Sequence, residues 1–197
     1  MKFNFFKLMS FFLLFGGLIL LGYSGYHLMN QKIQEDKALQ EAKEVVNTSR
    51  KKSNLETTNA VSYHYSKGDV VGILTIPKLK KELPIIEGTE EEELEKGVGH
   101  YSETNLPGQK NRIFLAGHRD TVFKSMGEIE KGDTLSIQME SGTHQYEVFE
   151  TFIVKETDLS VLQPTSPEEI LTLSTCYPFE YLSSTEERYI INARRIN

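Results

Sequence analysis

The most apolar stretch of the chain lies in its first thirty residues. Residues 5–26 carry a single charged side chain, Lys7, and residues 11–21 contain no polar side chain. A helix of about 20 mostly apolar residues is long enough to cross the hydrocarbon core of a bilayer. The pattern therefore predicts a transmembrane signal-anchor helix over residues 5–26.

The charges that flank this stretch predict its orientation. Lys2, Lys7 and the α-amino group all lie on its N-terminal side, and positive charge tends to stay on the cytoplasmic side of a membrane. We therefore expect residues 1–4 in the cytoplasm and everything after the helix outside the cell. A cleaved signal peptide is the alternative, but Gly22-Tyr23-Ser24 is a poor cleavage site, and both interpretations export the remainder.

A polar segment separates the apolar stretch from the next hydrophobic pattern. Residues 31–46 are charged and contain alanines, which favours a helix, whereas residues 47–54 are polar without any apolar period. The second composition is typical of linkers. We expect residues 27–67 to form an extracellular stalk, helical at first and polar throughout.

From about Gly68 the pattern changes to short apolar runs bounded by turn residues, which predicts strands. Ser141-Gly142-Thr143 lies between two of these runs and is typical of a hairpin turn. Seven or eight short strands with few helices favour an all-β fold, a single antiparallel sandwich or barrel over residues 68–197. The expected strands are residues 71–76, 83–86, 113–116, 134–139, 145–154, 170–176 and 188–196.

Composition narrows the classes of function. The chain has 22 basic and 28 acidic residues and a net charge of −6, which argues against a nucleic-acid partner because such a surface must be basic. It has one cysteine, Cys176, so it has neither an internal disulfide nor a metal site built on several thiolates. No cofactor and no metal is predicted.

Three residues at strand ends could together perform acyl transfer. Cys176 closes one apolar run, His118 follows another, and Arg188 opens the last predicted strand. A thiolate attacks carbonyls, a histidine can both donate and accept the proton near neutral pH, and a guanidinium can stabilise an oxyanion. About eleven loop residues separate Cys176 from Arg188, so pairing of their strands would fold this loop over the gap between them.

Each of these residues also has a structural explanation. A cysteine in an apolar run is often buried packing, His118 could be a turn residue, and Arg188 could be a surface charge. His100 lies in Gly-Val-Gly-His-Tyr, and whether it touches the site is left open. The acidic run 90–93 is expected to be a solvated helix start, because carboxylates along one helix do not converge on a calcium ion.

Taken together, the motifs resemble those of the sortases, the membrane-anchored cysteine transpeptidases of Gram-positive bacteria. The resemblance covers roughly Val70 to the C-terminus. The segment Gly97–Tyr101, followed by Leu106-Pro107-Gly108, is similar to the corresponding segment of class D sortases, and class E sortases are the next most similar. The matching segments are Leu115–Thr121, Thr172–Cys176, Arg188–Ala193, Gly97–Tyr101 and Leu106–Gly108.

The resemblance implies an eight-stranded β-barrel and a defined reaction. Cys176 would cleave an LPxT-type sorting signal of surface proteins after its threonine, with an LPNTA-like signal implied by class D. The thioacyl-enzyme would then pass to an amine of lipid II or peptidoglycan. His118 would be the acid and base, Arg188 would bind substrate and stabilise the oxyanion, and Thr175 would line the substrate or oxyanion site. Only Glu103 is acidic between Val98 and Arg112, so calcium activation is not expected.

Two other functions fit parts of the pattern. An L,D-transpeptidase-like enzyme would share the order of histidine and cysteine, but Ser174-Thr175 does not supply its Ser/Thr-His-Gly before the cysteine. A papain-like protease is disfavoured, because its cysteine precedes its histidine in the sequence, whereas here His118 precedes Cys176. A membrane-tethered binding domain with a buried, inert cysteine is the alternative from a different class. We expect a single-pass protein of the Gram-positive cell membrane with its catalytic domain outside the cell.

Overall fold

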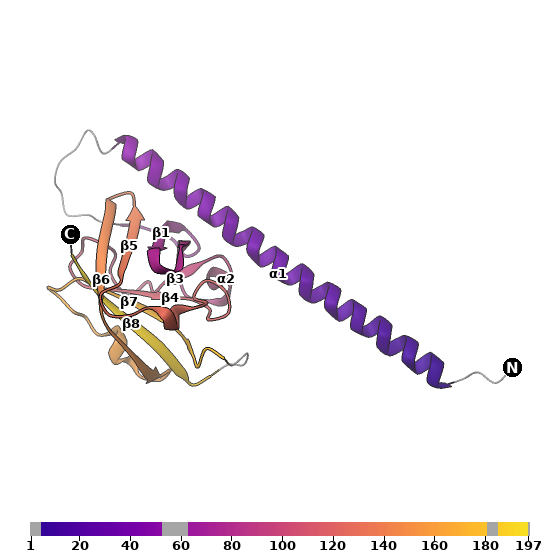
Figure 1. The fold of residues 1–197 in the computed structure, drawn as a ribbon. Coiled ribbons are helices and arrows are strands. Elements are labelled where there is room, and N and C mark those ends of the chain that lie inside the picture. The colour runs from indigo at the N-terminus through magenta and orange to yellow at the C-terminus, as the bar shows by residue number, and fades with distance from the viewer. Residues whose placement is uncertain (1–4, 53–62, 181–184, 197) are drawn as a thin grey trace.

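A computed structural model of the chain describes residues 5–52, 63–180 and 185–196. Figure 1 shows a barrel of strands with one long helix, α1, running along one side and far beyond it. The helices are α1 (Phe5–Lys52) and α2 (Glu91–Leu94), with short 3-10 turns at Pro77–Leu79, Met126–Glu128 and Leu159–Leu162. The strands are β1 (Val70–Ile76), β2 (Lys81–Glu87), β3 (Val98–His100), β4 (Arg112–Ala116), β5 (Thr134–Met139), β6 (Gly142–Lys155), β7 (Ile170–Tyr177) and β8 (Glu187–Arg195).

The eight strands close into a barrel in the order β1-β2-β3-β4-β7-β8-β6-β5. This confirms the all-β, eight-stranded barrel, and the predicted hairpin joins β5 to β6. The expected antiparallel arrangement is wrong for two pairs, since β2–β3 and β4–β7 run parallel. Parallel neighbours need long crossovers, and the chain between β4 and β7 passes through two other strands.

Alternation of side chains along the strands builds the core. In β7, Leu171 and Leu173 point into the barrel, and in β8 Ile191 and Ala193 do the same. Because successive side chains of a strand point to opposite faces, the residues between them lie on the outer face of the barrel. That outer face carries the candidate site. Other interior residues are Leu74, Ile76, Ile85, Ile113, Leu115, Ile137, Tyr146 and Val148.

Helix α1 runs without a break for 48 residues. Its large apolar side chains between Leu8 and Met29 are exposed, and it is long and apolar enough to cross a membrane. The polar linker expected from residue 47 is helical as far as Lys52, and residues 53 and 54 lie outside the described part of the chain. The boundaries of cytoplasmic end, anchor and stalk stay predictions.

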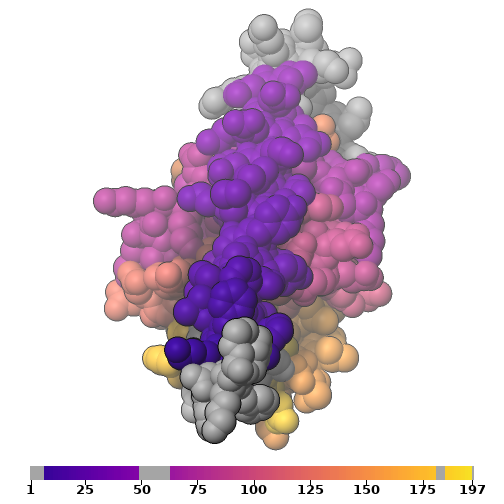
Figure 2. Space-filling model, turned by 90° about the vertical axis from the view of Figure 1, so that its right-hand side faces the viewer, coloured from indigo at the N-terminus to yellow at the C-terminus, as the bar shows by residue number. Residues whose placement is uncertain are grey.

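The second half of α1 lies against the barrel. Ala38 and Ala42 are buried against Val70, Ile73 and Ile86, and Figure 2 shows the helix crossing this face. Small side chains allow the helix backbone to approach the sheet closely. The part of the predicted stalk that was expected to be helical is thus packed against the barrel.

Candidate active site

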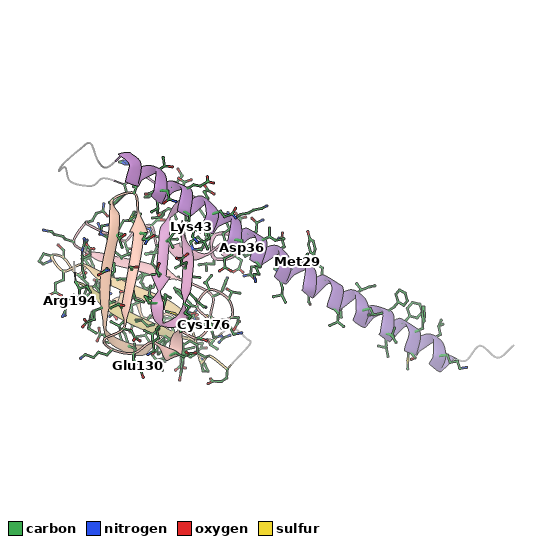
Figure 3. All side chains as sticks on the ribbon, turned by 45° about the horizontal axis from the view of Figure 1, so that its top comes forward. Met29, Asp36, Lys43, Glu130, Cys176 and Arg194 are labelled. Atoms are coloured by element: carbon green, nitrogen blue, oxygen red, sulfur yellow. The ribbon has the colours of Figure 1, made fainter. Side chains whose placement is uncertain are left out.

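Cys176 and Arg188 are direct partners across the β7–β8 ladder. Leu173, Thr175 and Tyr189 belong to the interior side of these strands. By alternation, Cys176, Ser174 and Arg188 therefore share the outer face. Figure 3 labels Cys176 at one end of this ladder and Arg194 at the other. Cys176 is a free cysteine and is partly exposed as a residue.

The parallel pairing of β4 with β7 brings His118 to the same end of the barrel. Ala116 pairs with Ser174, and the Gly117 amide donates to the Ser174 carbonyl at 3.1 Å. Two residues further along each segment come His118 and Cys176, and neighbouring strands lie about 4.8 Å apart. The fold thus gathers the imidazole, the thiol and the guanidinium at one end of three adjacent strands.

Arg188 is held by the segments on either side of it. Its Nη2 donates to Glu156 Oε2 at 2.7 Å, and its Nη1 donates to the carbonyls of Thr185 at 2.6 Å and Glu187 at 3.1 Å. A guanidinium has five N–H donors in a rigid fork. These three bonds fix the orientation of the guanidinium and leave it donors for a substrate oxygen.

His118 has a carboxylate neighbour that the sequence did not indicate. Its Nε2 lies 3.5 Å from Oε1 of Glu91, in the first turn of α2. A capping box between Glu90 and Glu93 fixes this turn, as the expectation of a helix start implied. The contact depends on where the β2–β3 crossover lies over the end of β4, which no local pattern reveals.

Thr175 lies on the other side of β7 from the thiol. Its side chain is 4% exposed, and its Oγ1 donates to the Gly117 carbonyl at 2.8 Å. The hydroxyl is thus directed into the barrel, where it ties the end of β7 to the residue before His118. This geometry gives the side chain a positioning role, whereas the resemblance implied that it lines the site.

A groove of about 280 Å³ runs along the outer face beside Arg188. It is mostly apolar, and the segment after β6 forms one of its walls. The strands contribute Phe114, Ala116, Val154, Lys155, Ser174, Arg188 and Ile190, the segment after β6 contributes Glu156, Asp158, Leu159, Val161 and Leu162, and Thr89 and Tyr101 complete the lining. Cys176 and His118 do not line this groove, but Ser174, two residues before the thiol on β7, does.

His100 is engaged elsewhere. It is 2% exposed, its Nδ1 lies 2.6 Å from Glu87 Oε2, and its Nε2 lies 3.1 Å from the Asn105 carbonyl. Burial opposes the charge of Glu87, but the contacts with His100 and Ser102 outweigh it and hold the pKa of this carboxyl below its ordinary value. His100 thus braces the barrel wall next to Tyr101.

Among the described residues, no group of three or more His, Cys, Asp or Glu side chains is placed to hold a metal ion. The groups that the fold brings to this end of the barrel are a thiol, an imidazole and a guanidinium. Together they can perform nucleophilic attack, proton transfer and oxyanion stabilisation.

Comparison with known proteins agrees with this geometry. The family model described as a sortase domain matches residues 74–196. Sortase D of Bacillus subtilis strain 168 is 40% identical over 195 residues, covering 96% of this chain and 98% of that protein. The solved structure of a Clostridium perfringens sortase D5 transpeptidase matches with a TM-score of 0.69 and 30% identity, over 83% of this chain and 99% of that one. The catalytic domain of Bacillus anthracis SrtD matches at 36% identity and a TM-score of 0.59, over 72% and 97%.

The closed barrel and the sortase-domain match identify the class of protein as a cysteine transpeptidase. The chain belongs to the sortase family. Its relatives include class D sortases, as the motifs predicted, and the L,D-transpeptidase-like and non-catalytic alternatives are thereby excluded.

Proposed function

We propose that this sortase cleaves an LPxT-type sorting signal after its threonine and transfers the protein to an amine of peptidoglycan or lipid II. Cys176 is the nucleophile, His118 the general acid and base, and Arg188 the oxyanion and substrate ligand. The cross-strand pairing of Cys176 with Arg188 on one face carries the proposal. The pairing puts both residues on one face of the β7–β8 ladder, and Arg188 also lines the groove on that face.

The reaction follows in two balanced halves. The Cys176 thiolate attacks the threonine carbonyl carbon, and the resulting oxyanion accepts hydrogen bonds from Arg188. The C–N bond breaks as His118 gives a proton to the leaving amine, which leaves a thioester. An acceptor amine then attacks the thioester, His118 takes its proton, and the thiolate departs.

The groove accounts for the substrate class. Phe114, Ala116 and Ile190 offer an apolar surface, which suits the leucine and proline of the signal, and Ser174 lies next to the thiol along β7. We infer an LPNTA-like signal, because the resemblance to class D sortases implies this variant of the LPxT signal. The segment after β6 would cover the bound peptide.

The location follows from α1. Its exposed apolar residues lie within the membrane, the N-terminus is cytoplasmic, and the barrel is at the outer surface. The length and composition of the helix support a single-pass anchor. Surface proteins that carry the sorting signal are the partners, and no nucleic acid is involved.

Peptide cleavage by the full chain in detergent tests the proposal. We expect cleavage after threonine in an LPNTA peptide and ligation to an added amine, with loss of both in Cys176→Ala and His118→Ala. The control His64→Ala, at an exposed histidine, should retain activity. Unchanged cleavage by Cys176→Ala would overturn the assignment of the nucleophile.

A further inference from the structure

The turn that follows His118 is closed by a residue from another part of the barrel. The ammonium of Lys81, at the start of β2, donates to the carbonyls of Val122 at 2.7 Å, Lys124 at 2.9 Å and Thr121 at 3.3 Å. An ammonium has three donors and no acceptor. All three are therefore used on one turn.

That turn sets the backbone of His118. The amide of Phe123 donates to the His118 carbonyl at 3.0 Å, and the amide of Thr121 does so at 3.4 Å. Phe123 and Met126 then anchor the turn in the core. Any displacement of the carbonyls bound by Lys81 would consequently move the residue that carries the imidazole.

Lys81 also lies beneath the anchor helix. It lines a groove between α1 and the barrel together with Glu35, Thr121 and Lys124. Burial lowers the pKa of Lys81, and the nearby Glu35 opposes this lowering. The helix is held there by Ala38 and Ala42 on the barrel wall, and Figure 3 shows Asp36 and Lys43 along the same stretch beside the barrel.

An exposed ion pair adds little to this docking. Lys43 Nζ lies 2.7 Å from Glu82 Oε2, but both side chains are about half exposed, and such pairs contribute little stability. The buried alanines therefore hold α1 on β1 and β2, and Glu35 then lines the groove beside Lys81 and the turn.

We propose that Lys81 is a positioning residue for His118 and couples the docked anchor helix to the active site. The inference rests on the proposed role of His118. A helix seated on β1 and β2 keeps Lys81 covered and directed at the turn, so the imidazole stays aligned with the thiol. Undocking of the helix would loosen the turn and slow acyl transfer without changing the groove for the peptide.

Lys81→Met tests the first half, because it keeps the length of the side chain and removes all three donors. In the full chain in detergent we expect kcat for an LPNTA peptide to fall about tenfold or more, since small misplacements of reacting groups are costly. KM should stay within about twofold of the wild-type value, because Lys81 does not line the groove beside Arg188. Lys81→Arg should recover most of the loss. Lys80→Met removes an exposed charge next to it and should behave as wild type.

Ala42→Glu tests the second half by placing a charge in the buried helix contact. We expect the same fall in kcat, while Glu41→Gln on the exposed side of α1 should have no effect. An Ala42→Glu chain with wild-type kcat would overturn the coupling, and a Lys81→Met chain with wild-type kcat would overturn the positioning role.

The side-chain NMR signal of His118, assigned with His118→Gln, keeps this test separate from the proposed reaction. Lys81→Met should shift or broaden this signal while the melting temperature of the barrel stays close to that of Lys80→Met. If the wild type does not process any sorting peptide, the proposed function fails, and the NMR comparison still decides the role of Lys81. An unchanged His118 signal in Lys81→Met overturns it.

Discussion

Glu91 and His118 face each other across the end of β4, with Oε1 and Nε2 3.5 Å apart. The Glu91 side chain is 74% exposed, so solvent screens the contact and its effect on the imidazole is modest. Its value is geometric, because a carboxylate on one ring nitrogen favours one orientation of the ring.

We predict that Glu91→Gln lowers kcat about two- to fivefold, the range expected for a screened pair. Glu92→Gln, at the next exposed carboxylate of α2, should leave kcat unchanged. Steady-state cleavage of an LPNTA peptide measures both. A loss above about a hundredfold would instead mean that Glu91 takes part in proton transfer.

Arg188 should not tolerate lysine. Arg188→Lys keeps a charge but removes the fork that bonds Glu156 and the Thr185 carbonyl, so the charge is no longer aimed at the oxyanion. We expect kcat to fall about a hundredfold. Arg194→Lys, on the same face at the far end of β8, is the matched control and should keep its activity. Equal rates for the two variants would contradict the oxyanion role.

The groove predicts a specific effect on peptide binding. Ala116→Leu would project a larger side chain into a cavity of about 280 Å³. We expect KM for the peptide to rise about tenfold or more, because a filled groove loses apolar contact with the substrate. Alkylation of Cys176 by iodoacetamide, a small reagent, should proceed at the wild-type rate. Slower alkylation would show that the substitution had disturbed the thiol itself.

Thr175 should matter for stability through its buried hydroxyl. Thr175→Val keeps the shape but leaves the Gly117 carbonyl without the 2.8 Å bond, which costs about 1–2 kcal/mol of unfolding free energy. Thr175→Ser retains the donor and should lose less. Urea unfolding of both variants checks this. Unchanged stability with a raised KM would favour the substrate-lining role instead.

Most of the barrel could be predicted from the sequence because alternation is local. The runs that end at Cys176 and begin near Arg188 pointed to two strands, and their pairing followed from a loop of moderate length between them. His118 was placed at a strand end by the same argument. Each of these inferences depends only on neighbouring residues, so each could be made without knowing the fold.

The remaining features depend on contacts between distant segments. The parallel pairings reflect how the crossovers travel, and Glu91 meets His118 only because α2 lies over the end of β4. Lys81 is unremarkable in the sequence, since nothing local indicates that three carbonyls some forty residues away will surround it. Residues 47–52 continue α1 although they have no apolar period, because a polar composition is also compatible with a helix.

The pH dependence of stability should report on Glu169, which is 7% exposed at the end of the barrel away from Cys176. Arg195 donates to its Oε1 at 2.7 Å, Tyr146 donates to the same oxygen at 2.8 Å, and the Gly108 amide donates to Oε2 at 2.9 Å. Burial alone would raise the pKa of this carboxyl, but these donors outweigh it and hold the pKa below its ordinary value.

A carboxyl whose pKa is lower in the folded than in the unfolded state stabilises the fold above its unfolded pKa of about 4.3. That contribution disappears as the pH falls through the folded-state value. Glu169→Gln should therefore lower the unfolding free energy at pH 7 by about 2–3 kcal/mol, somewhat less than for a fully buried pair because Arg195 is partly exposed. The difference from wild type should shrink below about pH 4. Glu168→Gln, at the exposed neighbour, should show neither effect in urea titrations between pH 3 and 7, and a constant difference for Glu169→Gln across that range would mean that the carboxyl is not charged in the folded barrel.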